Sequence, residues 1–260
     1  MPLFREGRLR KRWRWAGAFG ERWMVFAADV EVGPVPVRFW GVLDRSSGRL
    51  LERSRRGLPL RRPEVAFSGD DLILDSSLAS ARLGFGESEP VECVCPAGNG
   101  NYTWTRKRCG MSVTGEIVLD GETHPFEGRG VIDESAGYHP RHTAWSWSAG
   151  VGRSRDGRDV AWNLVAGIND PASASERAVW LDGSPSEPGP VSFDGLEALS
   201  FDDGSTMSFA VEAERSHSER LPPLVSSAYR APLGSFTGAL AGGIELESGL
   251  GVMERHEATW

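Results

Sequence analysis

The sequence predicts an all-β protein, with two successive antiparallel β-barrels or strongly curved sheets within its 260 residues. Three observations support this fold class. Extended segments bounded by turn residues recur along the chain, no long window keeps a clean helical period, and 32 glycines imply many tight turns. Two successive barrels fit the chain length. A barrel of about eight strands can enclose one small ligand.

The strands are expected wherever apolar and polar residues alternate between turn signals. We expect an N-terminal β domain over residues 1–118 and a C-terminal β domain over residues 119–260. Ser76–Leu83 is expected to form at most a short helix. Extended segments are expected at, among others, residues 22–32, 35–44, 71–75, 91–95, 102–107, 112–120, 143–153, 159–168, 178–181 and 244–253.

Asp-Gly pairs mark the expected hairpins, because both positions tolerate a positive φ. A two-residue turn at Asp156-Gly157 predicts that Trp147 faces Ala166 and that Trp145 faces Ile168. One face of this hairpin is then aromatic and the other is small and polar. The aromatic face is either plain core or one wall of an apolar ligand cavity. The ligand-binding residues expected here are Trp145, Trp147, Trp162 and Asn163.

Residues 128–142 gather the titratable groups that proton transfer needs. Adjacent carboxylates raise each other's pKa when they are partly buried, and histidine titrates near neutrality. The alternative is a solvated loop with capping acids. The candidate catalytic residues are Asp133, Glu134, His139 and His142, and Tyr138 is a candidate ligand contact.

Near the C-terminus, Glu254 and His256 share one face of an expected strand. A carboxylate that orients an imidazole is a common acid/base arrangement, and it is equally a common surface pair. We include both residues among the candidate ligand contacts.

The charge is unevenly distributed. Residues 1–62 carry 15 basic and 6 acidic residues, whereas residues 63–260 carry 14 basic and 30 acidic ones. The interleaved arginines and tryptophans of Arg8–Trp15 have the chemistry to bind phosphates and stack on bases. In a strand, however, the same alternation gives a solvated basic face and an apolar inner face, which is typical of an edge strand. We favour the edge strand over binding to nucleic acid or an anionic surface, which stays as the alternative.

Several classes of protein and of site find no support in the sequence. Three cysteines, at positions 93, 95 and 109, do not form the framework of a secreted disulfide scaffold, and their spacing predicts no metal site. No phosphate loop or dinucleotide motif is present, so we expect no cofactor. The first 20 residues contain no apolar run of signal-peptide length, and no stretch is long enough to cross a bilayer, so we expect a cytoplasmic protein.

Six short motifs are spread over most of the chain, at residues 15–20, 102–107, 130–133, 145–147, 163–167 and 251–254. Through them the chain resembles an uncharacterised bacterial family, domain of unknown function 2804. More distantly, Gly128–Asp133, Gly137 and Trp145–Trp147 follow an order similar to that in the two-domain lipocalin-like group, which includes carotenoid hydratases and tocopherol cyclases. The tryptophan of that group's first element is absent here. The resemblance implies tandem lipocalin-like (calycin-type) barrels and isoprenoid or lipid ligands.

Together these observations favour a protein that binds a small apolar molecule in or between two barrels. If it is an enzyme, we expect cofactor-free proton chemistry, namely hydration, cyclisation or isomerisation, with tryptophans shielding a carbocation. The alternatives are a non-catalytic lipid-binding module and a binder of anionic surfaces through residues 5–15. The sequence leaves the oligomeric state open.

Overall fold

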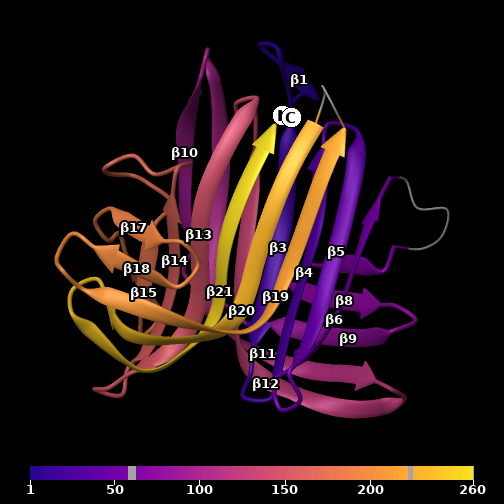
Figure 1. Ribbon diagram of the computed structural model, residues 1–260, viewed down its shortest axis with the longest axis vertical. Helices are drawn as coiled ribbons and strands as arrows, with labels where there is room; N and C mark the ends of the chain where they lie inside the picture. Colours follow the sequence, from indigo (N-terminus) through magenta and orange to yellow (C-terminus); the bar gives the residue numbers. More distant parts are fainter. Residues whose placement is uncertain (58–62, 222–224, 260) are drawn as a thin grey trace.

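The computed structural model describes residues 1–57, 63–221 and 225–259, and it confirms an all-β protein. Over those ranges every regular element is a β-strand. Most strands belong to two large antiparallel sheets, each curled into a half-barrel (Figure 1). Two short strands, β1 (Phe4–Arg5) and β2 (Arg8–Leu9), form a separate hairpin. No helix that could cross a membrane occurs in the described chain.

The first sheet contains ten strands, and β11 is its longest member. Alternate residues of β11 are buried from Asn101 to Val113, as the two-residue period of a strand requires. Its first half pairs with β10 (Val91–Gly98) and its second half with β9. The order across the sheet is β6 (Arg49–Arg56), β5 (Val35–Asp44), β4 (Trp23–Val32), β3 (Lys11–Phe19), β12 (Glu122–Gly137), β11 (Asn101–Leu119), β9 (Ala79–Phe85), β8 (Asp71–Asp75) and β7 (Val65–Ser68).

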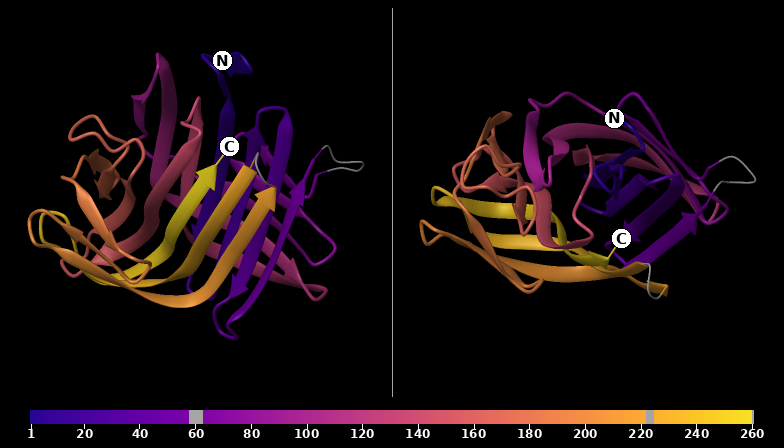
Figure 2. Two further views of the ribbon diagram at one scale, coloured as in Figure 1. Left: turned by 45° about the horizontal axis from the view of Figure 1, so that its top comes forward. Right: turned by 90° about the horizontal axis from the view of Figure 1, so that it is seen from above.

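Within the described residues the second sheet contains nine strands, and four long ones form its centre. The order across it is β16 (Ser184–Ser186), β15 (Ala178–Leu181), β14 (Asp159–Ala166), β13 (His142–Ser154), β21 (Ile244–Thr259), β20 (Val225–Leu240), β19 (Thr206–Leu221), β18 (Ala198–Phe201) and β17 (Val191–Asp194). Figures 1 and 2 show its long strands β19–β21 lying across β3–β5 of the first sheet.

Three hydrophobic cores follow from this arrangement. One lies inside each half-barrel, and the third lies between the two sheets. Strand β3 shows how alternation divides residues between cores, because Ala16 and Ala18 pack inside the first half-barrel while Trp15 and Phe19 pack between the sheets. A strand that is apolar on both faces belongs in the middle of a sheet. Strand β3 therefore lies between β12 and β4, and its predicted position at an edge is wrong.

The β13–β14 hairpin differs by one residue from the predicted register. Trp147 pairs with Val165 rather than Ala166. The reason is the loop, in which Gly157 donates a backbone hydrogen bond to Ser154 over 2.9 Å and has a φ of +87°. This is a three-residue loop with a left-handed glycine, not a two-residue turn. Because a slip of one residue exchanges the faces of a strand, Trp162 points away from Trp147 and into the core of the second half-barrel.

The structure differs from two further expectations. Most of Ser76–Leu83 belongs to strand β9 (Ala79–Phe85) and not to a helix. Residues 118 and 119, where we expected one domain to give way to the next, are paired within the β11–β12 hairpin. The chain leaves the first sheet at Gly137 and enters the second at His142.

Candidate functional site

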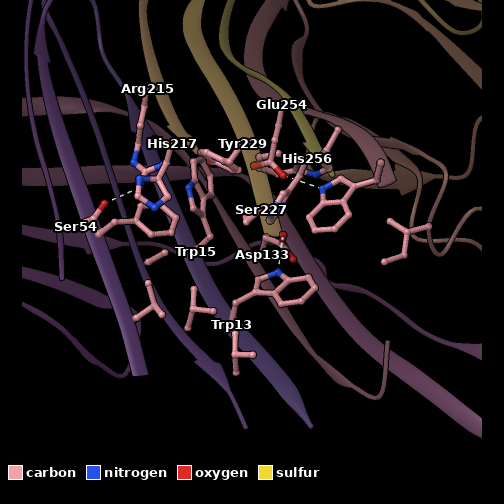
Figure 3. A pocket seen from close by; sticks show the side chains of 18 of the residues that line it. Trp13, Trp15, Ser54, Asp133, Arg215, His217, Ser227, Tyr229, Glu254 and His256 are labelled. Carbon is pink, nitrogen blue, oxygen red and sulfur yellow. Dashed lines mark hydrogen bonds between the residues drawn. The ribbon is translucent and has the colours of Figure 1, made fainter. Parts of the chain in front are cut away.

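A cavity of about 440 Å³ lies between the two sheets and continues the core that they share. Four tryptophans form much of its apolar wall: Trp13, Trp15, Trp145 and Trp147. Two of them meet across the interface, because the rings of Trp15 and Trp147 contact edge to face with centroids 5.2 Å apart. Titratable side chains from both sheets face the same space (Figure 3).

The first sheet contributes a row of directly paired residues. Asp133 of β12 pairs with Lys107 of β11 on one side and with Trp15 of β3 on the other. The Trp15 ring lies over Gly17, where a Cβ atom would come within 2.3 Å of it. The glycine therefore makes room for the ring. The row continues from Trp15 through Ala28, Phe39 and Ser54.

The second sheet contributes a matching row across four strands. Tyr229 of β20 pairs with His217 of β19 and with His256 of β21, and His256 pairs with Trp145 of β13. Two residues along β21, Glu254 pairs with Trp147. Since paired residues share a face of the sheet, all six side chains point into the cavity.

Glu254 is an acid of the cavity with a strongly perturbed pKa. Burial raises the pKa of its carboxyl from 4.5 to about 7, and hydrogen bonds only partly oppose that effect. Trp145 donates one of them, from Nε1 to Oε1 over 2.7 Å, and Tyr229 donates another. The negative charge of Asp133 also contributes to the raised pKa of Glu254.

His256 lies beside this acid. Burial, followed by the charge of Arg215, lowers the pKa of its imidazole to about 4, so the ring is neutral at physiological pH. Its Nε2 lies 2.9 Å from the hydroxyl oxygen of Ser227, and its ring centroid lies 4.3 Å from that of Trp145. A neutral histidine has one ring nitrogen that donates a hydrogen bond and one that accepts a hydrogen bond.

Asp133 is held by an ion pair at the back of the cavity. Lys107, fully buried, forms a salt bridge with Asp133 and lies 3.4 Å from the carboxylate of Glu176. Burial raises the pKa of Glu176. Trp13 donates a hydrogen bond from Nε1 to Asp133 over 3.2 Å (Figure 3). Asp133 is thus a fixed carboxylate that faces the cavity.

Five of the residues expected at the site line this cavity: Asp133, Trp145, Trp147, Glu254 and His256. They come from β12, β13 and β21, so two consecutive strands and a third from far along the chain meet here.

Glu134 does not accompany Asp133 into the cavity, which corrects the expectation of two adjacent acids. Neighbouring residues of a strand point to opposite faces, so Glu134 lies on the other side of β12. There its Oε2 accepts a hydrogen bond from Nε of Arg106 over 2.8 Å. The two carboxyl groups cannot act on one ligand.

His139 and His142 are also placed away from the cavity. His139 is fully buried behind Trp13, with ring centroids 5.1 Å apart, and burial lowers the pKa of its imidazole to about 3. His142 is exposed, and its Nδ1 lies 2.9 Å from the hydroxyl of Thr259. The break between β12 and β13, with its bend at Arg141, leaves both imidazoles outside the cavity.

Three candidate ligand contacts have structural partners instead. Tyr138 donates a hydrogen bond from its hydroxyl to the carbonyl of Pro2 over 2.7 Å. Trp162 faces the second half-barrel because of the altered hairpin register. Asn163 is buried and accepts a hydrogen bond from Nε1 of Trp147 over 2.8 Å, so it orients a cavity residue without lining the cavity.

Other residues that line the cavity were not among those expected at the site, notably Trp13, Trp15, Arg215 and Tyr229. The alternation of β3 identified the first two as inward-facing, but nothing in the sequence distinguished a cavity wall from core. Arg215 and Tyr229 become visible only once β19, β20 and β21 are paired.

The basic run near the N-terminus largely forms ion pairs with other residues of the same chain. Arg10 and Arg12 both form salt bridges with Glu31, and Arg14 forms one with Asp70. These ion pairs reduce the positive charge that the run could offer to phosphates. No cluster of three metal-ligating side chains occurs among the residues that the structure describes.

The fold and the cavity define a class of protein: two curled antiparallel sheets that enclose an apolar cavity with titratable groups. The family model named Domain of unknown function (DUF2804) matches residues 81–260, and the chain belongs to this family. No curated protein matches the chain.

Three solved structures share the fold at low sequence identity. A Nitrosomonas europaea protein provisionally assigned as AttH has a TM-score of 0.60 and 12% identity, over 95% of this chain and 92% of that chain. Kievitone hydratase from Nectria haematococca has a TM-score of 0.57 and 9% identity, over 96% and 88% of the two chains. CghA has a TM-score of 0.53 and 12% identity, over the same 96% and 88%. The lipocalin-like two-unit fold implied by the sequence resemblance is confirmed.

Proposed function

We propose that the protein binds one small, mostly apolar molecule between its two sheets and exchanges a proton with it through Glu254, as a cofactor-independent hydratase, cyclase or isomerase would. One observation carries the proposal: a carboxyl group with a pKa raised to about 7 faces an apolar cavity of about 440 Å³. A group that titrates near the working pH both donates and accepts protons efficiently.

The other groups of the cavity have roles that suit such a reaction. Asp133, paired with Lys107, supplies a fixed negative charge on the opposite wall. The aromatic walls shield a developing positive charge through cation–π attraction and keep water away. Two carboxyl groups in different environments are a recurring arrangement for acid and base roles. Kievitone hydratase, one of the structural neighbours, is named for a hydration, which supports the same general chemistry.

The binding step is testable with N-phenyl-1-naphthylamine, a neutral dye whose fluorescence rises in apolar cavities. The dye should bind the wild-type protein at a single saturable site. Val30 lines the cavity, so Val30→Trp should fill part of it and abolish binding. Val211→Trp is the matched control, because Val211 is exposed and outside the cavity.

Equal binding by both tryptophan variants would contradict a site between the sheets. If the dye binds as expected but no proton-transfer activity depends on Glu254, the protein is a non-catalytic lipid-binding module instead.

A further inference from the structure

The cations that line the cavity differ in how fully they are neutralised. Lys107 lies between Asp133 and Glu176, as described above. Arg56 forms a salt bridge with Glu219 that is also part of the lining. In contrast, Arg215 faces the cavity with a weaker set of partners.

Arg215 extends from β19 and is almost completely buried, with an exposed fraction of 5%. Its guanidinium carbon lies 4.2 Å from the ring centroid of Phe39 and 5.0 Å from that of Tyr229. Both rings contact the guanidinium by cation–π attraction, and their centroids lie 6.2 Å apart, so they border it without sandwiching it and leave N–H groups for polar partners. One of them, on Nη2, donates to the hydroxyl of Ser54 over 2.7 Å (Figure 3).

The carboxylate nearest to Arg215 is a poor counter-ion. Oε2 of Glu52 lies 3.3 Å from Nε of Arg215, but Nε has no aligned hydrogen bond to a described residue. Burial raises the pKa of Glu52 despite the neighbouring cation. Arg45 offers a contrast, because its Nε and Nη2 form a two-pronged contact with Glu212 at 2.6 and 2.7 Å.

The positive charge of Arg215 therefore reaches into the cavity. It lowers the pKa of His256 and acts on Glu254 in the same direction. A buried guanidinium that contacts two aromatic rings and has an unaligned donor is suited to a planar acceptor with two oxygens.

We propose that Arg215 binds an ionised carboxylate of the ligand, so that the natural ligand is an amphipathic acid with its apolar body against the tryptophans. The proposal rests on the proposed function and narrows its substrate class. A bound carboxylate would accept hydrogen bonds from the guanidinium and would face His217, which lines the same end of the cavity (Figure 3).

The test compares decanoate with decan-1-ol, which share the alkyl chain and differ in charge. Each would displace N-phenyl-1-naphthylamine from the protein at about pH 8, where the acid is fully ionised. Wild-type protein should bind decanoate about tenfold or more tightly than decan-1-ol, as expected for hydrogen bonds to a charged group. Arg215→Met should bring this ratio to about one, and Arg215→Lys should lower it less because it keeps the charge.

Arg230→Met is the matched control, since it removes an arginine of neighbouring strand β20 whose exposed side chain pairs with Glu214 outside the cavity. It should keep the wild-type ratio. If Arg215→Met does not fold, Arg215→Lys decides, because an unchanged ratio in that variant counts against recognition by the guanidinium.

Equal affinity of the wild type for both compounds would overturn the proposed carboxylate site while leaving the apolar cavity intact. A preference for decanoate that survives in Arg215→Met would overturn it as well. Failure of the dye itself to bind the wild type would instead overturn the proposed function.

Discussion

Trp145 donates a hydrogen bond of 2.7 Å to the carboxyl group of Glu254, and the two residues lie on adjacent strands of the second sheet. The contact fixes the position of an acid that burial has brought to a pKa of about 7. Because an indole N–H is neutral, it orients the carboxyl without forcing it to remain ionised. An acid so held is able to change its protonation state without moving.

Glu254 should make stability fall as pH rises. The pKa of Glu254 is about 7 in the folded protein and 4.5 in the unfolded chain. Its contribution to the free energy of unfolding is therefore fully present below pH 4.5 and is lost as the pH rises through 7. Glu254→Gln does not titrate and still accepts from Trp145. Between about pH 5 and about pH 8, urea unfolding should show the variant gaining about 3 kcal/mol relative to the wild type. Parallel pH profiles would show that Glu254 titrates normally.

The buried cation behind Asp133 should be essential for stability. Lys107→Met leaves Asp133 and Glu176 facing each other without it and should cost about 3–5 kcal/mol in the free energy of unfolding. Arg106→Met is the control. Arg106 directly precedes Lys107 in β11, but it points to the outer face and pairs with Glu134. Its loss should cost about 1 kcal/mol or less. Similar costs in denaturant titrations would contradict a buried role for Lys107.

Trp147 should combine packing with ligand contact. Trp147→Ala should cost about 3–5 kcal/mol because the ring is buried, and it should also weaken dye binding. Trp147→Phe should recover most of the stability, although Asn163 then loses its hydrogen-bond donor. Trp104→Ala removes a less buried tryptophan of the first sheet that lies outside the cavity, and it should leave dye affinity unchanged. Unaltered dye affinity in Trp147→Ala would remove this ring from the binding site.

His139 should influence acid stability and not ligand binding. Burial lowers the pKa of its imidazole from 6.5 to about 3. Its contribution to the free energy of unfolding is therefore present above pH 6.5 and is lost as the pH falls toward 3. His139→Phe keeps a ring against Trp13 but cannot be protonated. Thermal melts at about pH 4 and about pH 7 should differ less for the variant than for the wild type. Loss of dye binding by folded His139→Phe would show that the residue reaches the cavity after all.

The extent to which the sequence predicts the fold is illustrated by its Asp-Gly pairs. Asp120-Gly121 and Asp182-Gly183 form two-residue turns in which both residues have positive φ, as expected. Asp156-Gly157 and Asp203-Gly204 have positive φ at the glycine alone and belong to longer loops. The dipeptide therefore marks a hairpin reliably but does not fix its loop length. That one-residue ambiguity decides which tryptophans share a face.

The candidate site was predictable only in part, for a related reason. Alternation is local, so it identifies Glu254 and His256 as neighbours on one face from the sequence alone. The same rule separates Glu134 from Asp133 once the segment is known to be a strand rather than a loop. The contact of Arg215 with Ser54 joins β19 to β6 across the two sheets, and no pattern within either strand indicates it.

The most direct test of proton exchange by Glu254 uses 5-nitrobenzisoxazole, a small apolar compound that requires no knowledge of the natural ligand. A carboxylate removes its C3 proton, the released electron pair completes a nitrile, the N–O bond breaks, and a coloured phenolate forms. The rate should rise with pH through an apparent pKa of about 7, since Glu254 must be ionised to accept the proton. Glu254→Gln should lower it by about 10²-fold or more. A wild-type rate no greater than that of Glu254→Gln, or a profile without this transition, would contradict proton exchange by Glu254.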